Sequence, residues 1–434
     1  MNRDAPPAPE AVEAALARVE RLNPRLNAYL HVDAAGALAA ARASWGPPDP
    51  ERPLAGMPIC VKDVIDVAGM PTTAGAAGWS RQPSADAVAV ARLRAAGAIV
   101  IGKGNTNEFA YGIDGKNPHR GDCHNPYDPA RMSGGSSSGP AVATATGMAR
   151  AGIGTDTTGS IRMPASLCGV VGVRPTRGLV PTAGVVPLAW SYDTVGPLAR
   201  TVADAALLLD VLAGRAPGEP PAPDAGGLRL GLATELLALA EEPVAARIRA
   251  TADALAGAGA AVEERSLPDP SRATAIHRLV QAAEAAAVHA PWFEQQRDRY
   301  APDVRARLQA GRQLSAEVYL RAQRHRRLFT RDFAAAMEGL DAILAPASPV
   351  TAPPLDATEI TINSSTQPLR PALLSCLLPI SQLDCPAVSV PIGMIDGLPV
   401  GMQLIGRPGS EQMLLRLAAA IEEIAEPVPA PPDD

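Results

Sequence analysis

Short apolar runs alternate with helical segments along this chain, and this alternation limits the fold more than any other feature. The runs at 59–61, 98–102 and 228–233 have the length of buried strands. The segments at 85–96 and 243–256 have the apolar spacing of helices. Strands that alternate with helices build a sheet covered by helices. We therefore expect an α/β fold with a mixed sheet.

The same spacing predicts further elements. Helices are expected within 8–43, including Tyr29 and Leu30, and over 141–151, 201–214, 273–290, 316–337 and 411–424; strands are expected at 260–264, 341–346, 387–391 and 400–405. Residues 190–197 are expected to form a loop. The Pro/Gly-rich segment 215–227 is typical of a linker or a surface crossing.

Bulk composition excludes several functional classes. The 434 residues carry a net charge of −6, which gives no reason to expect a nucleic-acid partner. No apolar run is long enough to span a bilayer, and the N-terminus lacks the apolar core of a signal peptide. The five cysteines are scattered, which is typical of reduced thiols. We expect a cytoplasmic protein with no membrane association.

The densest group of chemically useful residues lies between Met132 and Pro164. Two small-residue loops there carry Ser136 and Ser160, on either side of the expected helix at 141–151. A helix that begins in a Gly/Ser loop directs free N–H groups toward whatever is bound there. Two serines with two sets of backbone donors suggest acyl transfer with an oxyanion hole.

Lysine is rare in this chain, with Lys62, Lys103 and Lys116 as its three examples among 39 basic residues. A buried amine can lose its proton, whereas a guanidinium keeps it. Lys62 follows the expected strand at 59–61, and α/β folds place their sites at such strand ends. Lys62 is therefore a candidate general base, whereas Lys103 and Lys116 are expected to be surface residues.

Nine ordered motifs add to this picture. They lie at residues 54–63, 105–110, 125–129, 134–139 (Gly-Gly-Ser-Ser-Ser-Gly), 154–165 (Gly-Thr-Asp-Thr-Thr-Gly-Ser-Ile-Arg-Met-Pro-Ala), 168–176, 193–202, 386–391 and 397–406. Through these motifs the chain resembles the amidase signature family, and the resemblance extends from about residue 11 to residue 424.

The resemblance implies a single α/β/α domain over 1–424, built on a large twisted mixed sheet surrounded by helices. N-terminal helices would occupy 1–50, and the motif-bearing core with the catalytic residues would occupy 51–214. Residues 228–424 would complete the same sheet and the substrate pocket. The composition of 425–434 predicts a disordered tail.

The resemblance also implies a Ser–Ser–Lys triad. Ser160 matches the nucleophile, Ser136 the bridging serine beside a cis peptide, and Lys62 the base. In such a relay Ser160 attacks while Ser136 passes a proton to Lys62, and the reverse path protonates the leaving nitrogen. This chemistry requires neither a metal nor a cofactor.

Further positions match supporting roles in the family. The backbone N–H groups that match the oxyanion hole belong to Thr157, Thr158, Gly159 and Ser160. Asp156 and Arg162 match positions that brace this loop, and Met132 and Ser137 are expected to support the site. Arg326 stands where some members bind a substrate carboxylate, although the basic face of a solvated helix is the preferred interpretation.

The chain departs from the family pattern at Thr158, Ser138 and Pro140. Thr158 replaces a common glycine within the expected oxyanion loop. A β-branched residue there excludes a positive φ in practice. We therefore expect the N–H donor to be kept and the pocket to be narrower.

The expected function is hydrolysis of a small carboxamide or a urea-like amide by a stand-alone amidase, and a homodimer is left open. One alternative is the glutaminase subunit of a tRNA-dependent amidotransferase, although the Arg-Tyr-Gly-type segment normal there is not found. A second alternative is a nucleophile elbow, Gly135-x-Ser137-x-Gly139. The third is a non-enzymatic scaffold, which an intact set of Lys62 and two serines opposes.

Overall fold

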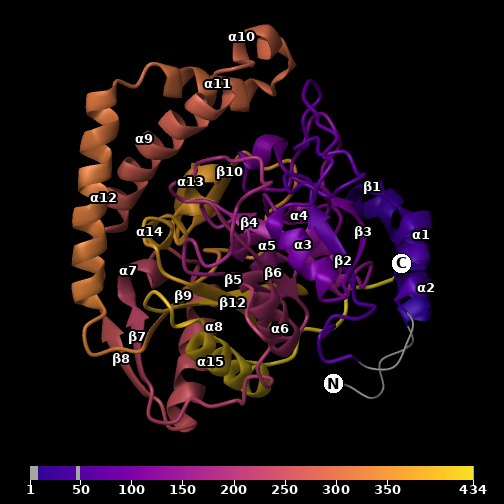
Figure 1. Cartoon of the computed structure of the whole chain (residues 1–434). Coiled ribbons are helices and arrows are strands. Elements are labelled where there is room, and N and C mark those ends of the chain that lie inside the picture. Colours follow the sequence, from indigo (N-terminus) through magenta and orange to yellow (C-terminus); the bar gives the residue numbers. More distant parts are fainter. Residues whose placement is uncertain (1–7, 45–48, 434) are drawn as a thin grey trace.

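A central sheet dominates the computed structural model, which describes residues 8–44 and 49–433 (Figure 1). Its strands are β1 (Tyr29–Val32), β2 (Pro58–Lys62), β3 (Ile99–Gly104), β4 (Ala151–Asp156), β5 (Val171–Arg174), β6 (Thr194–Ala199), β7 (Arg229–Ala233), β8 (Ala261–Arg265), β9 (Ala342–Pro346), β12 (Ala387–Ile395) and β13 (Leu398–Ile405). Of the segments predicted at the termini and near 50, residues 1–7, 45–48 and 434 lie outside the described residues.

Helices flank this sheet. They are α1 (Ala8–Leu26), α2 (Ala34–Ala43), α3 (Val88–Ala95), α4 (Ser138–Ala145), α5 (Arg162–Leu167), α6 (Val202–Ala213), α7 (Thr234–Leu237), α8 (Glu242–Gly257), α9 (Pro270–His289), α10 (Phe293–Gln296), α11 (Pro302–Arg312), α12 (Ala316–Ala336), α13 (Leu369–Leu374), α14 (Leu378–Ser381) and α15 (Glu411–Ile424). Short 3-10 turns cover Glu108–Ala110 and Arg297–Arg299, and a separate hairpin pairs β10 (Glu359–Ile362) with β11 (Ser365–Pro368).

The eleven strands lie in the order β1-β3-β2-β4-β6-β5-β12-β13-β9-β7-β8. β2 runs parallel to β3 and β4, and β7 runs parallel to β8 and β9. The strands from β4 across to β9 pair antiparallel. The predicted α/β fold with a large mixed sheet is therefore confirmed. Strands from 51–214 and from 228–424 belong to this one sheet.

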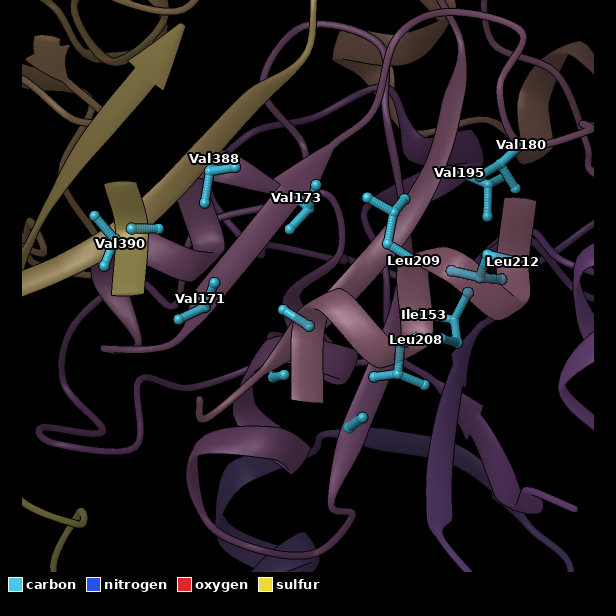
Figure 2. Packing of buried hydrophobic residues seen from close by; sticks show 14 of the residues in the cluster. Ile153, Val171, Val173, Val180, Val195, Leu208, Leu209, Leu212, Val388 and Val390 are labelled. Atoms are coloured by element: carbon cyan, nitrogen blue, oxygen red, sulfur yellow. The ribbon is translucent and has the colours of Figure 1, made fainter. Parts of the chain in front are cut away.

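The helix predicted at 201–214 shows how the core is built. The Thr201 side chain accepts a hydrogen bond from the Asp204 N–H at 3.2 Å, and Gly214 ends α6 with a φ of 72°. Leucines of α6 and apolar residues of β4, β5 and β6 belong to one buried cluster (Figure 2). They include Leu208, Leu209, Leu212, Ile153, Val171, Val173 and Val195.

Residues 29–32 form a strand rather than the predicted helix. α1 ends at Leu26, and Asn27 adopts a left-handed φ of 50° that breaks the helix. The Asn23 side chain then accepts a hydrogen bond from Tyr29 N at 2.7 Å and donates one to Tyr29 O at 3.2 Å. Tyr29 and Leu30 also fit the apolar spacing of a helix. Spacing alone does not identify so short a strand, which explains the error.

The helix predicted at 141–151 is shorter than expected. It ends at Ala145, and Ala151 already begins β4, a central strand that the sequence pattern missed. The strand was difficult to predict because it contains Gly152, and glycine has a low strand propensity. A Cβ at Gly152 would lie 2.6 Å from Pro140 O. Glycine therefore allows α4 to pack directly on β4.

The prediction of a loop at 190–197 is also wrong in part, because strand β6 begins at Thr194. Gly196 and Pro197 are typical of loops, which explains the error. A Cβ at Gly196 would overlap Val173 O of the neighbouring strand β5. The glycine is thus required by the close approach of two strands and does not mark a turn.

Helix α9 packs against both α11 and α12, and the three helices extend along one side of the molecule (Figure 1). Of the helices between residues 270 and 336, the sequence predicted α9 and α12, whereas α10 and α11 were missed. The terminal segment 425–433 contains no helix or strand. Tyr127 Oη donates a hydrogen bond to Pro429 O at 2.9 Å, and Arg21 forms an ion pair with Asp433 at 3.0 Å. These contacts place the segment beside α1.

Candidate active site

Lys62 ends strand β2 and is fully buried. Its Nζ lies 2.8 Å from Ser136 Oγ and 2.8 Å from Thr155 Oγ1. Burial lowers the pKa of Lys62 from 10.5 to about 7, and the carboxylates of Asp156 and Asp193 oppose this shift in part. Burial therefore favours the neutral amine, which is the form that a general base requires.

The loop before α4 carries Ser136 and lies against the loop of Ser160. The Gly135–Ser136 peptide is cis, and the Ser136 side chain is buried against Lys62. Ser137 N donates a hydrogen bond to Ser160 O at 3.1 Å. This bond joins the loop of Ser136 to the loop of Ser160. The structure therefore places Ser136 in contact with Lys62 and the loop of Ser160 directly beside them.

Ser137 is engaged by the backbone. Its Oγ donates to Thr155 O at 3.1 Å and accepts from Thr155 N at 3.2 Å. Within the described residues, the segment 124–132 that precedes this loop forms isolated bridges and no strand. A nucleophile elbow needs a strand before its turn and a free serine hydroxyl. The geometry at Ser137 provides neither.

Asp156 braces the loop of Ser160 from the end of β4. Its carboxylate accepts hydrogen bonds from Gly159 N at 2.7 Å and from Arg162 Nε at 3.0 Å. Arg174 forms a second buried ion pair with it at 3.0 Å. Burial alone would raise the pKa of Asp156, but the two guanidinium groups outweigh burial and hold the pKa well below its ordinary value. Asp156 therefore stays ionised.

The Gly159 N–H is already hydrogen-bonded to Asp156. Thr157 is oriented by its own side chain, whose Oγ1 donates to Asp193 Oδ1 at 2.6 Å. Gly159 itself has a φ of 115°, and a Cβ there would collide with Leu377. The loop is thus held from both sides, with glycine required at one position.

Lys103 was expected to be a surface residue, and this expectation is wrong. It is fully buried and forms an ion pair with Asp63 at 3.0 Å. Its Nζ also donates to Thr72 Oγ1 at 2.9 Å. Burial lowers the pKa of Lys103, and Asp63 opposes that shift. Lys116 is half-buried, with its Nζ 3.3 Å from Ala357 O.

Arg326 was expected to lie on the solvated face of a helix, and this expectation is also wrong. Its side chain is buried, and the guanidinium donates to Gln382 O at 2.9 Å and to Ser191 O at 3.0 Å. It also lies over the Tyr192 ring, 4.1 Å from the centroid. Met132 is fully buried in an apolar cluster with Met163. Both predicted residues thus have contacts within the protein.

Comparisons with known proteins agree with this geometry. The sequence profile of the Amidase family matches residues 10–415. The chain belongs to the amidase family. It is 39% identical over 462 residues to a glutamyl-tRNA(Gln) amidotransferase subunit from Roseiflexus sp. strain RS-1, covering 96% of this chain and 93% of that protein.

Solved structures give the same result for this amidase. A crystal structure described as an amidase superposes with a TM-score of 0.92 at 35% identity, covering 97% of both chains. The peptide amidase of Stenotrophomonas maltophilia superposes with a TM-score of 0.83 at 32% identity, covering 99% of this chain and 96% of that one. A Ser–Ser–Lys triad is a general feature of this family.

Sequence reasoning missed three residues of the amidase site, namely Thr155, Arg174 and Asp193. All three lie inside the motifs at 154–165, 168–176 and 193–202, so motif membership was the available signal. No helix in the described ranges is both long and apolar enough to span a bilayer. Within those ranges, no three His, Cys, Asp or Glu side chains are grouped as metal ligands.

Proposed function

We propose that this amidase hydrolyses the C–N bond of a small carboxamide or urea-like amide through an acyl-enzyme on Ser160. The contact that carries the proposal is the buried 2.8 Å hydrogen bond between Lys62 Nζ and Ser136 Oγ. The lowered pKa of Lys62, about 7, supports the role of this amine as a proton acceptor. The products are a carboxylate and ammonia or an amine.

In the proposed reaction Ser160 Oγ forms a bond to the carbonyl carbon. Ser160 passes its proton to Ser136, and Ser136 passes its own proton to neutral Lys62. Because Gly159 N–H already binds Asp156, we assign the developing oxyanion to the N–H groups of Thr157, Thr158 and Ser160.

The proton on Lys62 then returns through Ser136 to the leaving nitrogen, and the C–N bond breaks. A water molecule gives its proton to the same relay and attacks the acyl-enzyme. This second attack releases the carboxylate and restores Ser160. The same two groups thus serve as base in one step and as acid in the next.

A second candidate is the glutaminase subunit of a tRNA-dependent amidotransferase. The 39% identity to a glutamyl-tRNA(Gln) amidotransferase subunit favours it. The absence of an Arg-Tyr-Gly-type segment from this sequence opposes it. Such a protein would release ammonia from glutamine in dependence on its partner subunits, whereas a stand-alone amidase would act without them.

Labelling with a fluorophosphonate probe, followed by peptide mapping, tests the proposal directly. The adduct is expected on Ser160, lost in Ser160→Ala and kept in Ser137→Ala. An adduct on Ser137 would overturn the assignment. A panel of small amides, with glutamine tested in the presence and absence of bacterial amidotransferase subunits, separates the two candidates. Glutaminase activity that requires those subunits, with no hydrolysis of other amides, would favour the second.

A further inference from the structure

Thr158, which replaces a common glycine of the family, is bound to helix α9 by two hydrogen bonds. Its Oγ1 lies 2.9 Å from His277 Nε2 and accepts a hydrogen bond from Gln281 Nε2 at 3.0 Å. All three side chains are buried. A hydroxyl has one proton and two lone pairs, so the direction of the His277 bond decides where the Thr158 proton points.

Gln382 settles that direction. Its Nε2 donates to Leu378 O at 3.2 Å, and its Oε1 accepts from Tyr192 Oη at 2.9 Å, which fixes the amide orientation. The same Nε2 lies 3.1 Å from His277 Nδ1. An amide nitrogen can only donate, so Nδ1 is the acceptor, and the ring proton is on Nε2.

His277 therefore donates to Thr158, as Gln281 does. Burial lowers the pKa of His277 to about 3, with a further contribution from Arg326, so the ring is neutral. Both lone pairs of the Thr158 hydroxyl are occupied by these donors. Its own proton has no acceptor left among these partners and points away from α9.

We propose that the Thr158 hydroxyl is a specificity-determining donor, which binds an oxygen acceptor on the acyl part of the substrate beyond the scissile carbonyl. The inference rests on the proposed function. Thr158 lies two residues from Ser160, and its backbone N–H is assigned to the oxyanion. The side chain is held at α9 and not at the backbone N–H, so we assign the hydroxyl to a substrate atom other than the scissile oxygen. His277, Gln281 and Gln382 act as positioning residues.

The substrate class follows from this donor. The acyl group carries a second carbonyl, ureido or carboxylate oxygen, as in the half-amide or diamide of a short dicarboxylic acid. Malonamide and isovaleramide form a matched probe pair, because they have the same branching of heavy atoms and only malonamide offers the second acceptor. We expect the wild-type enzyme to favour malonamide in kcat/KM.

Thr158→Val keeps the branched shape and removes the hydroxyl. The ratio of kcat/KM for malonamide to that for isovaleramide should fall about tenfold, whereas Thr158→Ser should keep the ratio. A general disturbance of the loop lowers both values and leaves the ratio unchanged. Thr251→Val is the matched control, because Thr251 is a similarly buried threonine whose Oγ1 donates to Arg247 O within α8.

An unchanged ratio in Thr158→Val, or a wild-type enzyme that does not distinguish the two amides, overturns the inference. Nitrogen NMR of the His277 ring gives a test that is independent of turnover. The neutral tautomer with the proton on Nε2 is expected, and a proton on Nδ1 overturns the inference. Fluorophosphonate labelling of Ser160 reports the proposed function separately, so its absence overturns that function.

Discussion

The carboxylate of Asp63 pairs with Lys103 at 3.0 Å, although Lys62 is its neighbour in sequence. Consecutive residues at the end of a strand point to opposite faces, which directs Asp63 away from the serines. An adjacent carboxylate would stabilise the ammonium form of Lys62. The separation leaves burial as the main influence on Lys62, whose pKa falls to about 7.

Lys103→Met should destabilise the protein by about 3–5 kcal/mol, because it leaves the buried Asp63 carboxylate without its cation. Urea unfolding measures this loss. The double variant Asp63→Asn/Lys103→Met should recover part of it. Arg249→Met, which removes an exposed ion pair with Glu242, should change the free energy of unfolding by less than about 1 kcal/mol. A similarly small effect of Lys103→Met would contradict the prediction.

The plot of kcat/KM against pH should rise through one step near pH 7 and then stay level, because neutral Lys62 accepts the proton. Lys62→Arg should be about as inactive as Lys62→Ala, since guanidinium keeps its proton. Lys116→Arg is the control and should leave the profile unchanged. If Lys62→Arg kept most of the activity, Lys62 would contribute charge alone and the base role would be wrong.

Lys62→Met should raise the free energy of unfolding at pH 7 by about 1–4 kcal/mol, because it removes a buried amine. The pKa of Lys62 is about 7 in the folded protein against an ordinary 10.5. Between these values the unfolded chain binds more protons, so wild-type stability increases with pH. The advantage of methionine should be largest at and below pH 7 and shrink toward pH 10.5. Urea unfolding across this pH range measures it, and a less stable variant at pH 7 would refute the argument.

Gly159→Ala should lower kcat/KM at least about a hundredfold, because the new Cβ meets Leu377 and the φ of 115° disfavours any side chain. Adding Leu377→Ala should restore little, since it relieves the collision and leaves the strained φ. Gly257→Ala in α8 is the matched control, because a Cβ there has open space. Its activity should match the wild type.

Much of the fold could be predicted from the sequence, because capping residues mark helices such as α6 and apolar runs mark strands such as β13. The errors fall where small residues serve close packing. Gly152 and Gly196 are typical of turns in sequence, yet each lets a helix or strand approach a neighbouring backbone. Such an approach depends on residues distant in the chain, so local pattern does not reveal it.

The candidate site divides in the same way. Lys62, Ser136 and Ser160 could be named because each lies in a short, distinctive motif. Arg174 reaches Asp156 from another strand, and no spacing rule connects them. The burial of Lys103 was missed because its ion-pair partner, Asp63, lies in another segment of the chain. Nothing in the local sequence around Lys103 indicates this partner.

The strand order has a consequence for the chain during its synthesis. β12 and β13 lie between β5 and β9, yet they are made after both. Until residues 387–405 leave the ribosome, β5 and β9 each present an unpaired edge that another chain can bind. The nascent protein therefore carries two incomplete sheets from the synthesis of β9 until that of β12 and β13. A chain that stops before Ala387 has nothing to join them, so premature termination should yield material that chaperones hold or proteases remove.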